Sequence, residues 1–150
     1  MLVLGTILVA FIVLPSVSAA APCFGADPTI VGTPGNDNFL NFLRGTPGDD
    51  VIDGLSGNDV IGGEGGDDKI CGRSGEDRIV GGDGDDEIAG GSEDDWLIGG
   101  KGDDTLRGGS GDDLLDGGEG TNTLDGGDGS DICGNTNGNG TAENCEFVVE

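Results

Sequence analysis

A strict nine-residue period constrains this chain more than any other feature. Each unit has glycine at position one and an aliphatic side chain at position eight, which is Ile or Leu except for Cys133 in the last unit. Ten contiguous units occupy residues 45–134. Position six is aspartate or, once, asparagine: Asp50, Asp59, Asp68, Asp77, Asp86, Asp95, Asp104, Asp113, Asn122 and Asp131. Fixed columns of this kind predict a repeat architecture in which each unit is one small structural module.

Each unit reads as a turn followed by a short strand. Positions seven to nine place one aliphatic between two variable residues, which suits a β-strand whose side chains alternate between two faces. The glycines of positions one to six accept positive φ and so permit tight turns. A helix is excluded because each interior glycine costs about 1 kcal/mol relative to alanine. With two units per coil, equivalent strands stack in parallel about 4.8 Å apart, and the sequence therefore predicts an all-β solenoid.

The acidic side chains decide what such a solenoid must bind. The formal net charge is −24, and 16 of the 30 Asp and Glu residues fall at positions five and six of the units. Carboxylates stacked about 5 Å apart repel by about 1 kcal/mol even in water. A divalent cation between stacked turns removes this repulsion, and Ca²⁺ suits the site better than Mg²⁺ because it accepts flexible arrangements of oxygen ligands. The sequence has no histidine and no CxxC spacing, so transition-metal sites are not expected.

The ten position-six residues are therefore the predicted metal ligands, together with backbone carbonyls of the glycine-rich turns. Ten units give eight pairs of equivalent turns, so up to eight Ca²⁺ ions are expected. One aliphatic side chain per nine residues buries too little apolar surface to offset the entropy cost of ordering the chain. Folding is accordingly expected to depend on metal binding.

The repeat resembles a known family. The pattern Gly-Gly-x-Gly-x-Asp-x-aliphatic-x is similar to the nonapeptide of RTX proteins, also called hemolysin-type calcium-binding repeats, and the units starting at Gly81, Gly99 and Gly108 match every fixed position. The resemblance implies a right-handed parallel β-roll with Ca²⁺ bound in the turns by the position-six aspartates and turn carbonyls. Weaker or missing sites are expected at both ends and near Asn122. The departures from the pattern are Thr46, Leu55, Glu64 and Arg73 for the second glycine, Glu93 for the third, Asn122 for the aspartate and Cys133 for the last aliphatic. Glu93 either distorts its turn or adds a carboxylate.

The first twenty residues resemble a secretory signal peptide. An apolar run over residues 1–14 ends at Pro15 and is followed by small residues, so cleavage after Ala19 or Ala20 is expected. The apolar run is shorter than the roughly 20 residues of a transmembrane helix. We therefore expect a secreted, extracellular protein with no membrane insertion once residues 1–20 are removed.

Export would place the cysteines in an oxidising compartment, where disulfides persist. Four cysteines allow three pairings. The polar, glycine-rich segment between Cys133 and Cys145 can close a loop easily, so we favour that pair, which leaves Cys23 with Cys71.

The flanking segments are expected to cap the open ends of the solenoid. Residues 21–44 form the predicted N-terminal cap, which includes an out-of-phase repeat at 32–40 followed by a four-residue insertion at 41–44. Residues 135–150 form the predicted C-terminal cap. The capping side chains are expected to be Phe24, Phe39, Phe42 and Leu43 at one end and Phe147, Val148 and Val149 at the other.

These features favour a secreted calcium-binding protein with a structural, adhesive or buffering role. Enzymatic activity is not expected, since the chain lacks histidine for the common nucleophile and metal sites. The negative charge argues against nucleic acid and anionic membranes as partners. Two alternatives stay open: an accessory to another exported protein, and a Ca²⁺-dependent surface- or ice-binding module that uses outward polar residues, here Thr46, Asn58, Thr105, Thr121 and Thr123.

Overall fold

The structure is a computed structural model that describes residues 23–38, 42–136 and 139–149. Within these residues the chain forms strands and turns, with no helix. The strands are β1 (Ile30–Val31), β2 (Leu43–Arg44), β3 (Val51–Asp53), β4 (Val60–Gly65), β5 (Lys69–Ser74), β6 (Arg78–Asp83), β7 (Glu87–Ser92), β8 (Trp96–Lys101), β9 (Thr105–Ser110), β10 (Leu114–Glu119), β11 (Thr121–Asp128), β12 (Ile132–Gly134), β13 (Asn139–Glu143) and β14 (Phe147–Val149). Nothing in this described part forms a helix long and apolar enough to span a membrane.

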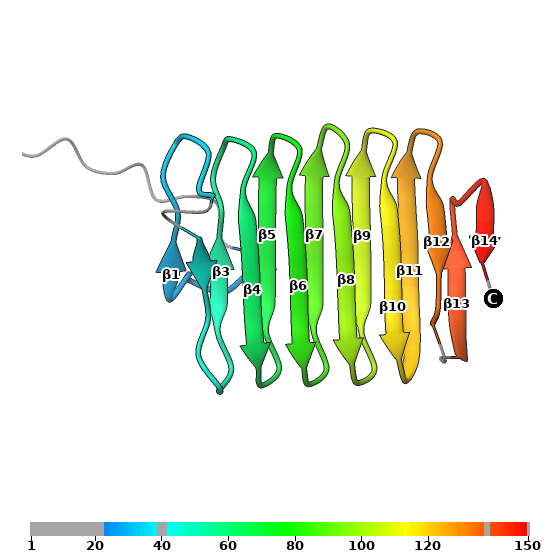
Figure 1. The fold of residues 1–150 in the computed structure, drawn as a ribbon, viewed down its shortest axis with the longest axis horizontal. Coiled ribbons are helices and arrows are strands. Elements are labelled where there is room, and N and C mark those ends of the chain that lie inside the picture. Colours follow the sequence, from blue (N-terminus) through cyan, green and yellow to red (C-terminus); the bar gives the residue numbers. More distant parts are fainter. Residues whose placement is uncertain (1–22, 39–41, 137–138, 150) are drawn as a thin grey trace, which may run out of the picture.

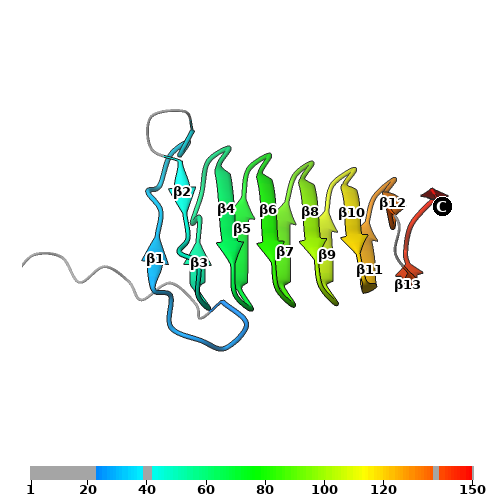
Figure 2. The same ribbon diagram turned by 60° about the horizontal axis from the view of Figure 1, so that its bottom comes forward.

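Successive strands alternate between two parallel sheets of seven strands each (Figures 1 and 2). The odd sheet has the order β1-β3-β5-β7-β9-β11-β13, and the even sheet has the order β14-β12-β10-β8-β6-β4-β2. Each strand pairs with the strand two units later, so Ile70 lies opposite Ile88 and Ile79 opposite Leu97. One coil therefore contains two repeats, and the predicted parallel β-roll is confirmed.

The interior of the roll is a single column of aliphatic side chains from each sheet. Because alternate strand residues point to opposite faces, only position eight of each unit faces inward. These side chains are at most 1% exposed: Ile52, Ile61, Ile70, Ile79, Ile88, Leu97, Leu106, Leu115, Leu124 and Cys133. The core is thus as thin as the sequence predicts, and it is uniform along the roll.

The first coil contains the out-of-phase repeat, but its insertion is placed differently from the prediction. The Asp37 amide donates to the Asp59 carboxylate at 2.7 Å, so the turn at residues 32–37 stacks on the turn at residues 54–59. Leu43 then pairs with Ile61 and takes the interior position. The four extra residues therefore lie between Asp37 and Leu43 rather than at 41–44. Phe39 and Leu40 lie outside the described residues.

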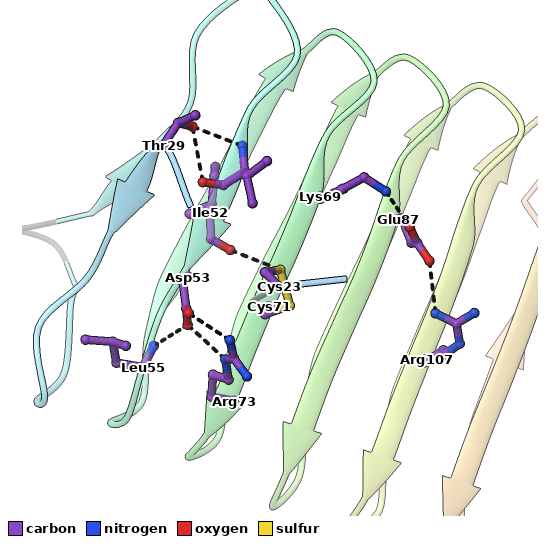
Figure 3. Close-up of a disulfide and its surroundings, with 11 residues drawn as sticks. Cys23, Thr29, Ile52, Asp53, Leu55, Lys69, Cys71, Arg73, Glu87 and Arg107 are labelled. Carbon is purple, nitrogen blue, oxygen red and sulfur yellow. Dashed lines mark hydrogen bonds and ion pairs between the residues drawn. A yellow bond between two sulfur atoms is a disulfide. The ribbon is translucent and has the colours of Figure 1, made fainter. Parts of the chain in front are cut away.

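Both favoured cysteine pairs are joined as disulfides, Cys23–Cys71 and Cys133–Cys145. Cys133 occupies the last interior position, so its bond ties the segment after the roll to the end of the core. Cys71 stands at position nine of its unit, and its bond ties the N-terminal segment to β5 (Figure 3).

The N-terminal segment lies over the outside of the odd sheet instead of covering the open end of the interior with Phe24. The Phe24 ring centre is 5.8 Å from the Lys69 ammonium and 5.5 Å from the Arg107 guanidinium. Lys69 and Arg107 both pair with Glu87, which bridges β5, β7 and β9 (Figure 3). Of the predicted capping side chains, Leu43 does join the core. The predicted signal peptide, residues 1–20, lies outside the described residues.

Candidate metal centre

The position-six residues form two ladders on opposite edges of the roll. In each ladder the backbone amide of one position-six residue donates to the Oδ1 atom of its equivalent on the next coil, at 2.7–2.9 Å. The odd ladder, before the odd strands, contains Asp50, Asp68, Asp86, Asp104 and Asn122. The even ladder contains Asp37, Asp59, Asp77, Asp95, Asp113 and Asp131. All of these side chains are buried, with at most 7% exposure.

The ladders bring together all ten residues that the sequence nominates and add one more. Asp37 stands five residues after Gly32, the same offset as in every other unit, but it belongs to the out-of-phase repeat and was not among the predicted ligands. The stacking of its turn on the next one places it at the start of the even ladder. The offset from Gly32 was the signal in the sequence that could have identified it.

The second carboxylate oxygen is the feature that points to a cation. Every ladder aspartate after Asp37 and Asp50 accepts the amide of the preceding coil at Oδ1, but in these eight the buried Oδ2 atom has no hydrogen-bond partner among the described residues. These are Asp59, Asp68, Asp77, Asp86, Asp95, Asp104, Asp113 and Asp131. A buried carboxylate oxygen without a donor is costly, so each of these atoms calls for a cation or a proton.

The same burial raises the pKa of seven ladder carboxyl groups: Asp59, Asp68, Asp77, Asp86, Asp95, Asp104 and Asp113. Desolvation is the largest cause, and repulsion from neighbouring acids adds to it, while the hydrogen bond from the preceding amide opposes both. The pKa of Asp95 rises to about 8, and those of Asp77 and Asp86 rise to about 7. The pKa values of Asp68, Asp104 and Asp113 rise to about 6. The central turns are therefore poor places for negative charge unless a cation is present.

In all of these turns except that of Asp95, a carbonyl oxygen lies close to the free carboxylate oxygen, next to the position-one glycine. A Cβ atom added to Gly99 would meet the Oδ2 atom of Asp104 and would lie 2.6 Å from the carbonyl oxygen of Gly117 on the next coil. The same pair of oxygens, one from position six and one from the next position-one glycine, recurs at Gly63, Gly81 and Gly108. Position one must be glycine here, because any side chain would fill the space between these oxygens. This donor set of carboxylate and carbonyl oxygen fits Ca²⁺.

The carboxylates stack in rows instead of gathering in clusters. Among the described residues, no group of three or more Asp, Glu or Cys side chains surrounds a common point. An ion held in a ladder would therefore depend on backbone carbonyls for much of its coordination. This requirement again suits Ca²⁺, which binds carbonyl oxygens readily, better than metals that need nitrogen or sulfur ligands.

The acids at position five form a second set of columns, which is exposed. Here the hydrogen bonds run in the opposite direction, from the amide of one coil to the carboxylate of the preceding coil. The Oδ1 atom of Asp67 accepts the Asp85 amide of the next coil at 3.0 Å, and the Oδ1 atom of Asp94 accepts the Asp112 amide at 2.8 Å. The position-five carboxylates themselves remain exposed to solvent. The buried position-six carboxylates are thus the better metal ligands, and the position-five acids surround them with negative charge.

The first coil departs from this arrangement. The Oδ2 atom of Asp50 accepts the Thr46 amide at 2.6 Å and the Thr46 hydroxyl at 2.9 Å. Asp37 receives the corresponding bonds from the Thr33 amide and hydroxyl, at 2.6 and 3.1 Å. Both turns have the sequence Gly-Thr-Pro-Gly, so a threonine replaces the second glycine. Their aspartates are satisfied by their own turns and do not require a cation.

The odd ladder ends at Asn122, which also lacks the need for a cation. Its Oδ1 atom accepts the Asp104 amide at 2.8 Å, as an aspartate would. Its Nδ2 atom donates to the Asn135 side chain at 3.2 Å and to the Gly118 carbonyl at 3.4 Å. The side-chain NH₂ group of Asn122 therefore occupies the place where a metal ion would bind beside an aspartate, and it carries the partial positive charge there.

The other replacements of glycine keep the backbone of the turn. Leu55, Glu64 and Arg73 at position two have φ angles of 78°, 79° and 86°, within the left-handed region that glycine occupies in later units. Glu93, the replacement at position four, has φ of 74°, and its carboxylate accepts the Gly75 amide of the preceding coil. Glu93 therefore leaves the turn in place and uses its carboxylate for backbone contact.

Comparison with known families agrees with this geometry. The chain matches the family described as RTX calcium-binding nonapeptide repeat in four copies, over residues 38–70, 72–106, 98–133 and 107–141. The matches cover more than half of the chain, which therefore belongs to this family and is a calcium-binding repeat protein. No curated protein and no solved structure matches the chain.

Proposed function

We propose that the roll binds Ca²⁺ at its stacked turns through the position-six aspartates and the adjacent glycine carbonyls, and that the chain folds as it binds. The observation that carries this proposal is the set of eight buried carboxylate oxygens that have no hydrogen-bond partner in the described part of the chain. Their number agrees with up to eight ions for the whole roll. The self-satisfied turns at Asp37 and Asp50 and the amide at Asn122 are the weakest candidates.

Folding on binding follows from how little else holds the coils together. The core offers one aliphatic side chain per nine residues, and the buried acids oppose one another along each ladder. A cation between stacked turns converts this repulsion into attraction and links successive coils. Because only the folded roll brings the ligands together, the binding free energy contributes directly to folding.

We place this protein outside the cell, as a structural, adhesive or buffering component. The sequence of residues 1–20 and the two disulfides support export to an oxidising compartment. Extracellular calcium is abundant enough for weak sites, whereas the cytosol would leave the chain unfolded. Export and folding would then be coupled by the metal.

The ice-binding alternative receives limited support. Thr105, Thr123 and Thr141 do align on β9, β11 and β13. The same column continues toward β5, however, as Glu87 and Lys69, which form an ion pair. A regular polar lattice therefore extends over only part of the odd sheet, and calcium-dependent folding remains the better-supported function.

The decisive experiment is a calcium titration followed by calorimetry and far-ultraviolet circular dichroism. In chelator we expect a coil-like spectrum, and in millimolar Ca²⁺ a β spectrum, with several ions bound per chain. Mg²⁺ at the same concentration is the control and should not restore the β spectrum. A chain that stays fully folded in chelator, or that folds equally with Mg²⁺, would contradict the proposal.

A further inference from the structure

The outer faces of the two sheets differ in chemistry. On the odd sheet, positions seven and nine carry mainly polar or charged side chains, including Lys69, Glu87 and Arg107, and Phe24 lies over them. On the even sheet the same positions are mainly apolar. We call this surface the even face, and it comprises Phe42, Val60, Val80, Trp96, Ile98, Leu114 and Ile132.

The even face is a continuous exposed patch on an otherwise acidic protein. Trp96 is 46% exposed, and Val80 and Leu114 on the adjacent strands are 44% and 39% exposed. Phe42 and Ile132 extend the patch toward either end of the roll, at 42% and 40%. Soluble monomers seldom display a row of large apolar side chains like this one, and such patches usually mark interaction sites.

The patch is centred on the middle strand of the even sheet. β8 is the fourth of the seven strands and carries Trp96, so β6 and β10 lie at equal distances on its two sides, as do β4 and β12 (Figure 1). On the β4 side, a hollow of about 490 Å³ lies between Phe42 and Trp96. On the other side, Leu114 and Ile132 project from β10 and β12.

The two halves of the even face are complementary to each other. The hollow over β4 and β6 has a size and polarity that suit apolar side chains such as those of β10 and β12. The charges follow the same division, since Arg78 stands on β6 at position seven of its unit and Asp116 on β10 at position nine, where its carboxylate also accepts hydrogen bonds from Thr136. Arg78 is exposed and forms no ion pair with any residue that the structure describes.

We propose that the even face binds a second copy of this chain. A twofold axis parallel to β8 and lying between the two faces would place β8 against β8, and β6 and β4 of one copy against β10 and β12 of the other. The projecting Leu114 and Ile132 of each copy then enter the hollow of the other copy. Arg78 of each copy then lies opposite Leu114 of the other copy, two residues along the strand from Asp116. A surface that is complementary to itself in this way is the requirement for a twofold dimer.

The size of the face sets the strength of the contact. The apolar row from Phe42 to Ile132 spans six coils, or about 24 Å at the usual strand spacing. Stable dimers bury roughly 800 Å² on each partner, and this narrow strip with its rim falls at or below that value. The net charge of −24 on each copy adds repulsion, which bound calcium and salt reduce. The dimer is therefore reversible and concentration-dependent, with Trp96 as its central anchor.

The test uses the fact that Trp96 is the only tryptophan of the chain. In millimolar Ca²⁺, sedimentation velocity of the exported chain should show the mass of a monomer at low concentration and twice that mass at high concentration. Over the same range the tryptophan emission should shift to shorter wavelengths, because Trp96 becomes buried. Circular dichroism on the same samples reports folding separately, so a failure of the proposed calcium binding is distinguishable from a failure to dimerise.

Paired variants test which surface is used. Trp96→Glu should abolish the dimer, whereas Thr105→Glu, at the equivalent outward position of the odd sheet, should leave it unchanged. Leu114→Glu should also abolish the dimer and retains Trp96, so its emission should no longer depend on concentration. A folded wild-type chain that stays monomeric, or a dimer that survives both even-face changes, would overturn the proposal.

A charge exchange tests the orientation. Arg78→Asp should weaken the dimer several-fold, and combining it with Asp116→Arg should restore the association, because the facing strands again carry opposite charges. Dimers that respond to neither change would refute the antiparallel arrangement of the two rolls. An association that appears only with other proteins or with lipid vesicles would exclude the second copy as the occupant.

Discussion

The first coil and the central coils solve the same electrostatic problem in different ways. In the first coil, Thr33 and Thr46 each donate an amide and a hydroxyl to the aspartate of their own turn. In the later coils position two carries glycine or another residue without a hydroxyl group, and among the described residues the equivalent oxygen of eight aspartates has no donor. The first coil can therefore form without metal, while the central coils cannot do so at low cost. We therefore expect the N-terminal end to form without metal and the calcium-dependent coils to stack on it.

The largest expected difference between these regions comes from removing one carboxylate in each. Asp95→Asn removes the charge from a central, fully buried site and should eliminate at least one bound ion and raise the calcium midpoint of folding several-fold. Asp50→Asn is the matched control, because Asn retains an oxygen that can accept the Thr46 amide. It should cost about 1 kcal/mol, typical of one weakened hydrogen bond, and leave the ion count unchanged. Calorimetric stoichiometry and calcium-dependent circular dichroism measure both effects.

Equal losses of ions in these two variants would contradict the contrast between the coils. An unchanged stoichiometry in Asp95→Asn would contradict the assignment of the even ladder as a metal site.

Acid should partly replace calcium in the central coils. The pKa values of Asp77, Asp86 and Asp95 rise from the ordinary value of 3.8 to about 7, 7 and 8 in the roll, mainly because of burial. The folded roll therefore binds more protons than the unfolded chain between about pH 4 and pH 8, and its stability in chelator falls as the pH rises through this window. We expect more β structure in chelator at pH 5 than at pH 8.

In calcium the dependence should reverse, because protons compete with the metal for the same oxygens. The calcium midpoint should rise as the pH falls below about 7. Asp95→Asn removes the group with the largest shift and should flatten the chelator profile. A β content in chelator that increases with pH would show that protonation of these carboxylates does not stabilise the roll.

The end of the odd ladder offers a gain-of-function test. In Asn122→Asp the side chain loses the donor that now faces Asn135 and the Gly118 carbonyl, so acceptors would face a new buried charge. Without calcium this should destabilise the last coils by about 1 to 3 kcal/mol. With calcium the variant should bind one more ion than the wild type. Thermal unfolding without calcium measures the loss of stability, and calorimetry with calcium measures the number of bound ions.

Asn122→Ser is the control, since it removes the amide without adding a charge. If the aspartate variant bound no additional ion, the missing carboxylate would not be what limits this end of the ladder.

Much of the fold follows from the period alone. The spacing of Asp, Gly and Ile or Leu determines the two-unit coil, the parallel register and the interior column that ends at Cys133. The position of the insertion is not readable in this way, because Phe39, at position eight of the out-of-phase unit, and Leu43 are equally suited to an interior site. Only the pairing of Leu43 with Ile61 decides between them.

The sequence predicts which side chains stack at the turns, but it does not predict the hydrogen bonds of each carboxylate. All position-six residues do lie in the ladders, yet the sequence does not reveal which carboxylates find donors. That depends on whether the Thr46 hydroxyl and amide reach Asp50. The apolar even face was missed for another reason. Aligning all units together hides the alternation between sheets, whereas comparing every second unit places Trp96 beside Leu114 and apart from Thr105.

The smallest expected effect concerns the threonine itself. Thr46→Val removes the hydroxyl that donates to Asp50 at 2.9 Å but keeps the backbone amide, which donates at 2.6 Å. One partner is lost while another remains, so the cost should be about 1 kcal/mol, in calcium and in chelator alike. Hydrogen exchange of the first-coil amides resolves a change of this size, and the central coils serve as an internal reference. An effect confined to calcium-loaded protein would mean that Asp50 binds metal after all, and the contrast between the first coil and the others would then fail.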